Sequence, residues 1–305
     1  MLAAPRQVIS WLLVLAATLP FVVSPTAAQE LEPRAYRTAP VGMNFILGTY
    51  SWSTGNVLTD PSVPIEDLQI DIHMAVVSYL RTLGLFGRSS SLTISLPYGY
   101  VTGSAQVQED LVTASRAGSA DIRMRIVVNL LGGPAMTPQE YAKFGQKRNI
   151  GVSLTVAAPT GQYDPTRLVN FGTNRWSFKP ELGYSSIKGR WILDAAAGFW
   201  FFTDNNDFFG GFKREQDPIG SFQAHLSYDI TKKIWISLDA NYFTGGRTTI
   251  DGVLKDDLQK NSRIGLTLSL PLRPRHSLRL AGAVGAFTSV GADFDQFLMS
   301  YLYRW

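Results

Sequence analysis

Apolar and polar residues alternate with a period of two in many segments after residue 40. The alternation is clearest in residues 221–230, 234–242 and 262–270, and it recurs in residues 67–74, 91–98, 121–128 and 149–156. In the last of these, Ile150, Val152 and Leu154 alternate with Gly151 and Ser153. A period of two places the two sets on opposite faces of a sheet. The pattern therefore predicts β-strands along most of the chain.

The connections between these segments alternate in length. Residues 185–189, 231–233 and 272–275 are short, whereas residues 56–66, 102–118, 160–174, 204–217 and 245–260 are longer and mostly polar. Short turns at one end and long loops at the other are typical of bacterial outer-membrane barrels. We predict an all-β fold, a transmembrane antiparallel up-and-down β-barrel of about 12 strands. A long inner connection at residues 131–147, with a helical turn from Thr137 to Phe144, departs from the rule.

The N-terminus has the features of a secretory signal peptide. Arg6 precedes an apolar stretch from Val8 to Val23, and Thr26-Ala27-Ala28 supplies small residues before a cleavage site. The stretch is shorter than the ~20 residues that a membrane helix needs. We expect residues 1–28 to be a signal peptide and residues 29–305 to be the barrel. Only residues 29–41 then precede the first strand, so no long N-terminal plug is expected.

The last strand ends in alternating aromatic residues. Phe297, Met299, Tyr301, Tyr303 and Trp305 share one face and reach the terminal residue. Tyr301, Tyr303 and Trp305 resemble the signal that the outer-membrane assembly machinery recognises, and they place aromatics at the membrane interface. These residues weigh against a soluble β-sandwich or a lipocalin-like barrel, which also alternates. The expected surroundings are the lipid bilayer and lipopolysaccharide of a Gram-negative outer membrane, after export through the periplasm.

Composition narrows the class of protein. Charged residues make up 17% of the chain and hydrophobic residues 45%, with a mean hydropathy of +0.02. Few charges without long apolar runs fit a barrel in which alternate residues meet lipid. The net charge of +4 comes from scattered basic residues, so no nucleic-acid partner is expected. The absence of cysteine excludes disulfides and thiolate metal sites.

Three short motifs resemble those of a known family. They are Gly118-Ser119-Ala120-Asp121, Ala158-Pro159-Thr160-Gly161, and Asn170-Phe171-Gly172-Thr173-Asn174-Arg175-Trp176. The chain is similar to the outer-membrane transporter family associated with the meta-cleavage pathway of phenol degradation. The resemblance implies an outer-membrane barrel that moves aromatic or other hydrophobic compounds. It implies no catalytic residue. Each motif is also rich in residues that end strands and form turns.

Alternation also predicts which titratable side chains line the lumen. Arg123 and Arg125, two residues apart, are expected on one face, where they would form a basic ladder with Arg263 or Arg279. Such a ladder would set solute selectivity. Alternatively, these groups pair with carboxylates and fill a narrow interior. The full candidate set is Asp71, His73, Asp121, Arg123, Arg125, Lys179, Glu181, Asp194, His225, Asp239, Arg263 and Arg279.

Enzymatic motifs are not evident. The three histidines are His73, His225 and His276, and none stands in a recognisable nucleophile or metal-ligand pattern. No phosphate-binding glycine loop or nucleotide fingerprint is present. We expect no catalytic site, no metal site and no cofactor.

An aromatic cluster follows the strand expected at residues 191–202. Phe199-Trp200-Phe201-Phe202 leads into an outer loop that contains Phe208, Phe209 and Phe212. Phe201 and the three loop residues would form a hydrophobic gate for an apolar solute. The alternative is an aromatic girdle plus a loop folded into the barrel mouth.

Two functions fit these features. The first is passive transport of small hydrophobic or aromatic molecules. The second is a structural or surface-interaction barrel with a closed lumen.

Overall fold

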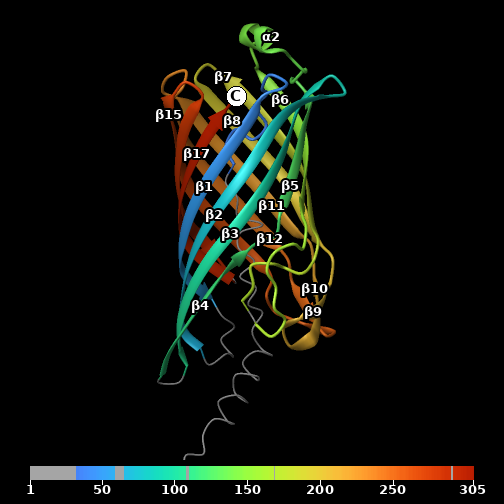
Figure 1. Cartoon of the computed structure of the whole chain (residues 1–305), viewed down its shortest axis with the longest axis vertical. Coiled ribbons are helices and arrows are strands. Elements are labelled where there is room, and N and C mark those ends of the chain that lie inside the picture. The colour runs from blue at the N-terminus through green and yellow to red at the C-terminus, as the bar shows by residue number, and fades with distance from the viewer. Residues whose placement is uncertain (1–31, 59–64, 108–109, 168, 290) are drawn as a thin grey trace, which may run out of the picture.

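The computed structural model describes residues 32–58, 65–107, 110–167, 169–289 and 291–305. The expected signal peptide at residues 1–28 lies outside these ranges. The described chain forms a closed, antiparallel β-barrel of 12 strands, as predicted (Figure 1). No helix in the described ranges is long and apolar enough to cross a membrane.

The barrel wall consists of strands β1–β8, β11, β12 and β15–β17, and smaller strands lie in the outer loops. The wall strands are β1 (Asn44–Leu58), β2 (Ile65–Leu85), β3 (Arg88–Val107), β4 (Asp110–Ser119), β5 (Arg123–Leu131), β6 (Arg148–Ala157), β7 (Ser177–Lys188), β8 (Trp191–Phe202), β11 (Ile219–Asp229), β12 (Trp235–Gly245), β15 (Gln259–Arg273), β16 (His276–Thr288) and β17 (Gly291–Arg304). The loop elements are β9 (Asn205–Phe208), η1 (Phe209–Gly211), β10 (Phe212–Gln216), β13 (Thr248–Ile250) and β14 (Val253–Leu254), which form a small sheet with η1 between β9 and β10. The helix α2 (Pro138–Lys143) lies between β5 and β6.

The first and last strands close the barrel. Gly48 of β1 faces Tyr301 of β17 in an antiparallel register that continues along both strands. Strands β4 and β5 occupy a single position in the wall, because both pair with β3. The wall position is interrupted at residues 120–122, and β6 pairs with β5 but not with β4 in the described ladder. The 13 segments of the sheet therefore correspond to 12 positions around the barrel.

Each wall strand has one apolar and one polar face. In β7, Leu182 and Tyr184 are exposed on the outside, whereas Lys179, Glu181 and Ser185 are buried on the inside. The outward side chains form a band suited to lipid, and the inward ones make the lumen polar. The final aromatics Tyr301 and Trp305 are exposed on the outside, as the alternation predicts.

The inner end of the barrel carries the short turns. Phe86 and Gly87 join β2 to β3, and both have positive φ angles, as a tight hairpin turn requires. The predicted helical turn is confirmed as α2, which begins with a capping box between Thr137 and Glu140. Figure 1 shows α2 above this end and the β9–β10 hairpin at the opposite, outer end.

The wall is taller on one side. Strands β2 and β3 have 21 and 20 residues, whereas β5 has 9. The expectation of a loop at residues 102–118 is wrong, because β3 and β4 continue their hydrogen-bonded ladder through most of it. Backbone pairing stabilises this hairpin, although Gly, Ser and Thr give it little apolar alternation. The loop at residues 158–176 lies beside the shorter part of the wall.

Candidate functional site

The segment from Glu32 to Val41 lies inside the inner end of the barrel. The Arg34 guanidinium donates to the carboxylate of Asp229 at 2.7 Å and lies 4.2 Å above the ring of Trp235. Glu32 forms an ion pair with Arg125 on β5, four wall positions from Asp229 on β11. The short segment before β1 therefore crosses the lumen, and it constricts the inner end of the barrel.

Tyr36 is the most tightly held residue of this segment. Its hydroxyl donates to Glu181 at 2.8 Å and lies 3.1 Å from the hydroxyl of Ser153. Its ring packs against Gly183 and Gly151, which face each other on β7 and β6, and a Cβ on either glycine would clash with the ring. Burial raises the pKa of Tyr36, and Glu181 adds to this effect. The hydroxyl therefore remains a donor at physiological pH.

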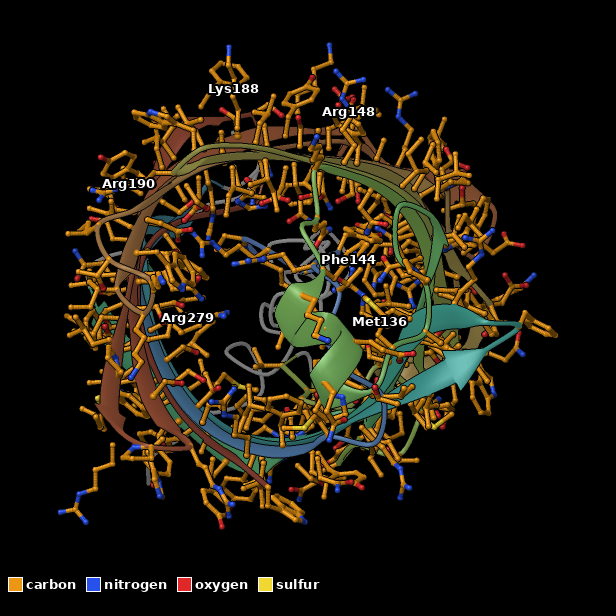
Figure 2. The ribbon with its side chains drawn as sticks, turned by 90° about the horizontal axis from the view of Figure 1, so that it is seen from above. Met136, Phe144, Arg148, Lys188, Arg190 and Arg279 are labelled. Carbon is orange, nitrogen blue, oxygen red and sulfur yellow. The ribbon has the colours of Figure 1, made fainter. Side chains whose placement is uncertain are left out.

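The rest of the segment is fixed by amide and hydroxyl groups. Asn149 donates to the carbonyl of Tyr36 at 2.5 Å. Thr38 donates through its hydroxyl to Gln146 at 2.8 Å, and its carbonyl accepts from the Tyr141 hydroxyl at 2.9 Å. Because Tyr141 belongs to α2, the long inner connection serves to hold the segment in place (Figure 2).

A buried charge cluster lies next to Tyr36, around the carboxylate of Glu181. Glu181 accepts from Arg125 at 2.9 Å and forms an ion pair with Lys179 at 3.1 Å, so one carboxylate serves two cations. Arg123 lies on the same face of β5 as Arg125. The predicted lumen position of Arg123, Arg125, Lys179 and Glu181 agrees with the structure. Arg125 is engaged by carboxylates, which favours the paired interior over an uninterrupted basic ladder.

Strands β11, β12 and β15 carry a second polar network on the inner face of the wall. Asp239 accepts from Ser237 and Thr267, each at 2.6 Å, and lies 2.8 Å from Nδ1 of His225. Ser237 donates to the carboxylate and not to the imidazole, so this group lacks the hydroxyl–base contact of a nucleophilic site. The predicted lumen position of His225 and Asp239 agrees with the structure.

Three further predicted residues also face inward. Asp194 on β8 is the cross-strand partner of His225 and is buried. Arg263 is buried on β15, and Arg279 on β16 lies 5.4 Å from the Trp235 ring. Figure 2 shows the Arg279 side chain pointing into the lumen. The basic side chains Arg263 and Arg279 thus line the wall across from β5 and β6.

The expected lumen position of Asp71 and His73 is wrong. Both side chains point outward: His73 accepts or donates a 2.7 Å hydrogen bond with the exposed Tyr50, and Asp71 accepts from the exposed Trp52 at 3.3 Å. Ile70 and Ile72 instead face the interior and are buried. The reason is that this half of β2 reaches the outer rim, where the exterior meets polar surroundings instead of hydrocarbon.

Asp121 anchors a loop and is not a free lumen charge. Its carboxylate accepts from the amides of Gly161 and Thr173, each at 2.9 Å, and from the Thr173 hydroxyl at 2.6 Å. The three family motifs meet here: Asp121 ends the first, Gly161 ends the second, and Thr173 lies in the third. The motifs therefore fix the loop at residues 158–176 across the break between β4 and β5.

This loop places Phe171 inside the barrel. Phe171 packs on Gly99 and Met74, in an apolar cluster that contains Ile70, Ile72, Met74, Val101, Ala120, Phe171 and Phe294. Sequence reasoning missed this cluster, because its members are far apart in the chain. The available signal was Gly99, a small residue on the inner face of β3 that leaves room for a ring.

The expected aromatic gate is divided between several surfaces. Phe201 is 46% exposed on the outside of β8, so it belongs to the girdle and its gate assignment is wrong. Phe208 is buried beneath the guanidinium of Arg214 at 5.4 Å, in the outer loops. Phe209 is half-buried in η1, and Phe212 is 38% exposed on β10. Trp200, in contrast, faces inward and is fully buried.

The described residues contain no group of three or more His, Asp or Glu side chains that could hold a metal ion. The candidate functional site is the lumen. It has three parts: an inner constriction around Tyr36, a polar middle, and an apolar outer cluster around Phe171.

Comparison with known proteins places the chain in a family. The family described as "Putative MetA-pathway of phenol degradation" matches residues 53–289. The chain belongs to this family. The match contains all three motifs, so the predicted kinship with proteins of phenol degradation is confirmed.

Solved structures share the fold of this family member. The COG4313 outer membrane channel from Pseudomonas putida F1 is 20% identical, with a TM-score of 0.77, over 90% of this chain and 100% of that chain. The beta domain of the Bordetella autotransporter BrkA is 10% identical, with a TM-score of 0.50, over 87% and 100%. These likenesses concern the fold alone. A search of curated proteins gives no match.

Proposed function

We propose that the protein is a passive channel of the Gram-negative outer membrane for small hydrophobic or aromatic compounds. The observation that carries the proposal is the apolar cluster around Phe171, which lies in the outer part of the lumen beyond the polar middle. An apolar lining favours solutes that gain by leaving water. Membership in a family described by phenol degradation supports the same solute class.

Passage requires the inner constriction to open. The Glu32–Val41 segment is held by side-chain contacts and by a backbone hydrogen bond from Val41 to Met136, and it contributes no strand to the wall, so it can leave without breaking the barrel. The proposed state for transport is one in which this segment moves aside. Export through the periplasm after removal of residues 1–28, insertion by the assembly machinery through the Tyr301, Tyr303 and Trp305 strand, and contact with lipopolysaccharide belong to the same proposal.

Liposome-swelling flux tests the proposal. Two proteins are compared, one lacking residues 1–28 and one that also lacks residues 29–41. Each is tested with sugars, amino acids and neutral aromatics as solutes. We expect aromatics to pass faster than sugars of similar size, and the shorter variant to be faster for all solutes. Discrimination by size alone would mean a general pore and would contradict the proposed solute class.

A closed structural barrel is the second candidate. It is favoured by the ionic contacts of Arg34 with Asp229 and of Glu32 with Arg125, which tie the segment to two separate strands of the wall, β11 and β5. Absence of flux in both proteins, with the barrel shown to be folded, would establish this alternative over the channel.

A further inference from the structure

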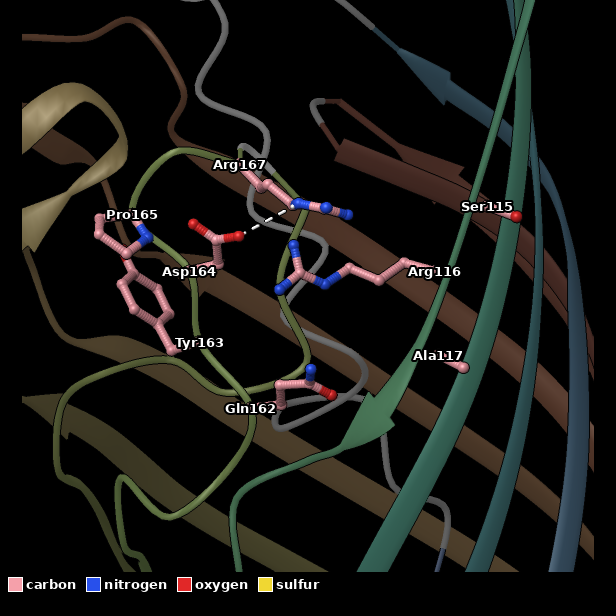
Figure 3. A pocket seen from close by; sticks show the side chains of 8 residues that line it. All are labelled: Ser115, Arg116, Ala117, Gln162, Tyr163, Asp164, Pro165 and Arg167. Carbon is pink, nitrogen blue, oxygen red and sulfur yellow. Dashed lines mark ion pairs between the residues drawn. The ribbon is translucent and has the colours of Figure 1, made fainter.

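A separate pocket lies between β4 and the loop at residues 158–176. Its volume is about 520 Å³, and its lining includes Arg116, Ala117, Gln162, Tyr163, Asp164 and Arg167 (Figure 3). Arg116 extends from β4 toward the loop, and Figure 3 shows its guanidinium facing the carboxylate of Asp164 and the guanidinium of Arg167. The volume is within the usual range of pockets that bind small molecules.

The pocket carries more positive than negative charge. Arg167 forms an ion pair with Asp164 at 3.1 Å, which leaves Arg116 as a second cation beside this pair. The Nη1 atom of Arg116 is buried and has no hydrogen-bond partner. A buried N–H without a partner costs free energy, and a guanidinium binds a carboxylate through two parallel hydrogen bonds. An anion would satisfy Arg116.

The loop side of the pocket is held in a fixed shape. The amide of Gln162 donates to the carbonyl of Ser119 at 2.8 Å, and the amide of Asp164 donates to Asn170 at 2.8 Å. Asp164 in turn accepts from the hydroxyl of Thr166 at 2.6 Å. A site whose groups are already positioned loses less entropy when a ligand binds.

The pocket adjoins the apolar cluster of the lumen. Arg116 is the cross-strand partner of Val101, and Gly118 is the partner of Gly99. Gln162 lies over Gly118, just as Phe171 lies over Gly99, so the cationic group and the apolar cluster are neighbours on one surface. The Tyr163 ring adds an aromatic surface to the pocket itself (Figure 3). This combination suits a ligand with an aromatic ring and one negative charge.

We propose that this pocket is a binding site for aromatic carboxylates, in which Arg116 holds the carboxylate and Tyr163 lies against the ring. The inference rests on the proposed function, since it names the class of aromatic solute that the channel collects at its outer end. Asp164 limits the affinity, because it competes with the ligand for Arg167.

Binding of benzoate to the detergent-solubilised protein tests the proposal, with equilibrium dialysis as the measurement. Benzamide is the neutral analogue and inorganic phosphate is the anion without a ring. We expect Arg116→Gln to weaken benzoate binding at least about tenfold, whereas Arg116→Lys keeps part of the affinity. Asp164→Asn should strengthen it several-fold. Lys188→Gln, at the exposed last residue of β7, is the matched control.

Each outcome decides the proposal. Unchanged benzoate affinity in a folded Arg116→Gln protein, weaker binding to Asp164→Asn, or equal binding of benzoate and benzamide would overturn it. Phosphate that displaces benzoate at equal concentration would show a general anion site, and would also overturn it. The swelling assay with neutral aromatics is independent: normal flux with no effect of Arg116→Gln on benzoate leaves the channel intact and removes only the carboxylate site.

Discussion

The hydroxyl of Tyr36 donates to the carboxylate of Glu181 at 2.8 Å and joins the segment before the first strand to the middle of β7. The two residues are 145 positions apart in the chain. Glu181 also binds Lys179 and Arg125, so one carboxylate connects the inner constriction to the charges of the lumen wall.

Removal of the Tyr36 hydroxyl should loosen the constriction. A hydrogen bond to a charged group contributes about 1.5–3 kcal/mol, so Tyr36→Phe should favour the displaced segment by roughly ten- to a hundredfold. Planar-bilayer recordings should show more frequent or larger openings. Tyr184→Phe is the control, because Tyr184 lies on the outer face of β7, the strand that carries Glu181. Equal recordings for the two variants would contradict the role of Tyr36.

A methyl group at Gly183 should displace the segment by steric means. The Cβ of Gly183→Ala would overlap the Tyr36 ring, whereas Gly48→Ala on the outside of β1 meets no atom. Because the chain has no cysteine, Ala35→Cys supplies a single reporter for a membrane-impermeant maleimide. We expect several-fold faster labelling in the Gly183→Ala background. Labelling at the rate seen with Gly48→Ala would show that the ring tolerates the methyl group.

Phe171→Ala should both weaken the barrel and widen its outer part. Loss of a buried phenylalanine costs about 3–5 kcal/mol in soluble cores, and Phe171 is buried among six apolar residues. We expect a lower urea midpoint and faster flux of aromatics. Phe287→Ala, at an exposed position of β16, should change either quantity much less. A lower midpoint without faster flux would limit Phe171 to a structural role.

The start of α2 should depend on pH. The amide and the hydroxyl of Thr137 donate to Glu140, which lowers the pKa of this carboxyl group. Because the folded-state pKa is the lower one, the stabilisation is present above about pH 4 and is lost as the pH falls through the folded value. The protection factor of the Tyr141 amide, its slowing relative to the intrinsic exchange rate at the same pH, should fall on acidification. Glu140→Gln keeps a capping side chain and should abolish this pH dependence. The same pH profile in Glu140→Gln and in the parent protein would refute the role of the Glu140 carboxylate.

The sequence predicts the faces of most wall strands because lipid meets one side of them. In β5, β7, β11 and β12 the apolar set faces outward and the polar set inward, so Arg125 and Asp239 are placed correctly. The same reasoning fails for Asp71 and His73. Alternation separates two faces without saying which one meets lipid, and near the rim neither face does.

Contacts of long sequence separation could not be predicted. Tyr36 and Phe171 lie in irregular segments, so no periodicity indicates that they enter the barrel. The sequence signals for the two rings are Gly183 and Gly99, which lie far from them in the chain. Which ring each glycine accommodates depends on the register between strands. The role of Asp121 as a loop anchor is likewise visible only once three separate motifs are brought together.

The seam between β1 and β17 joins the two ends of the wall, and the segment before β1 lies inside the closed barrel. A segment enclosed in this way must enter before the seam closes, or must thread through a finished ring. The contacts of Tyr36 with β6 and β7 can form as soon as those strands are paired. The order of events in assembly thus decides whether a newly made barrel is already shut, and a barrel refolded from urea need not begin in the same state as one inserted in the cell.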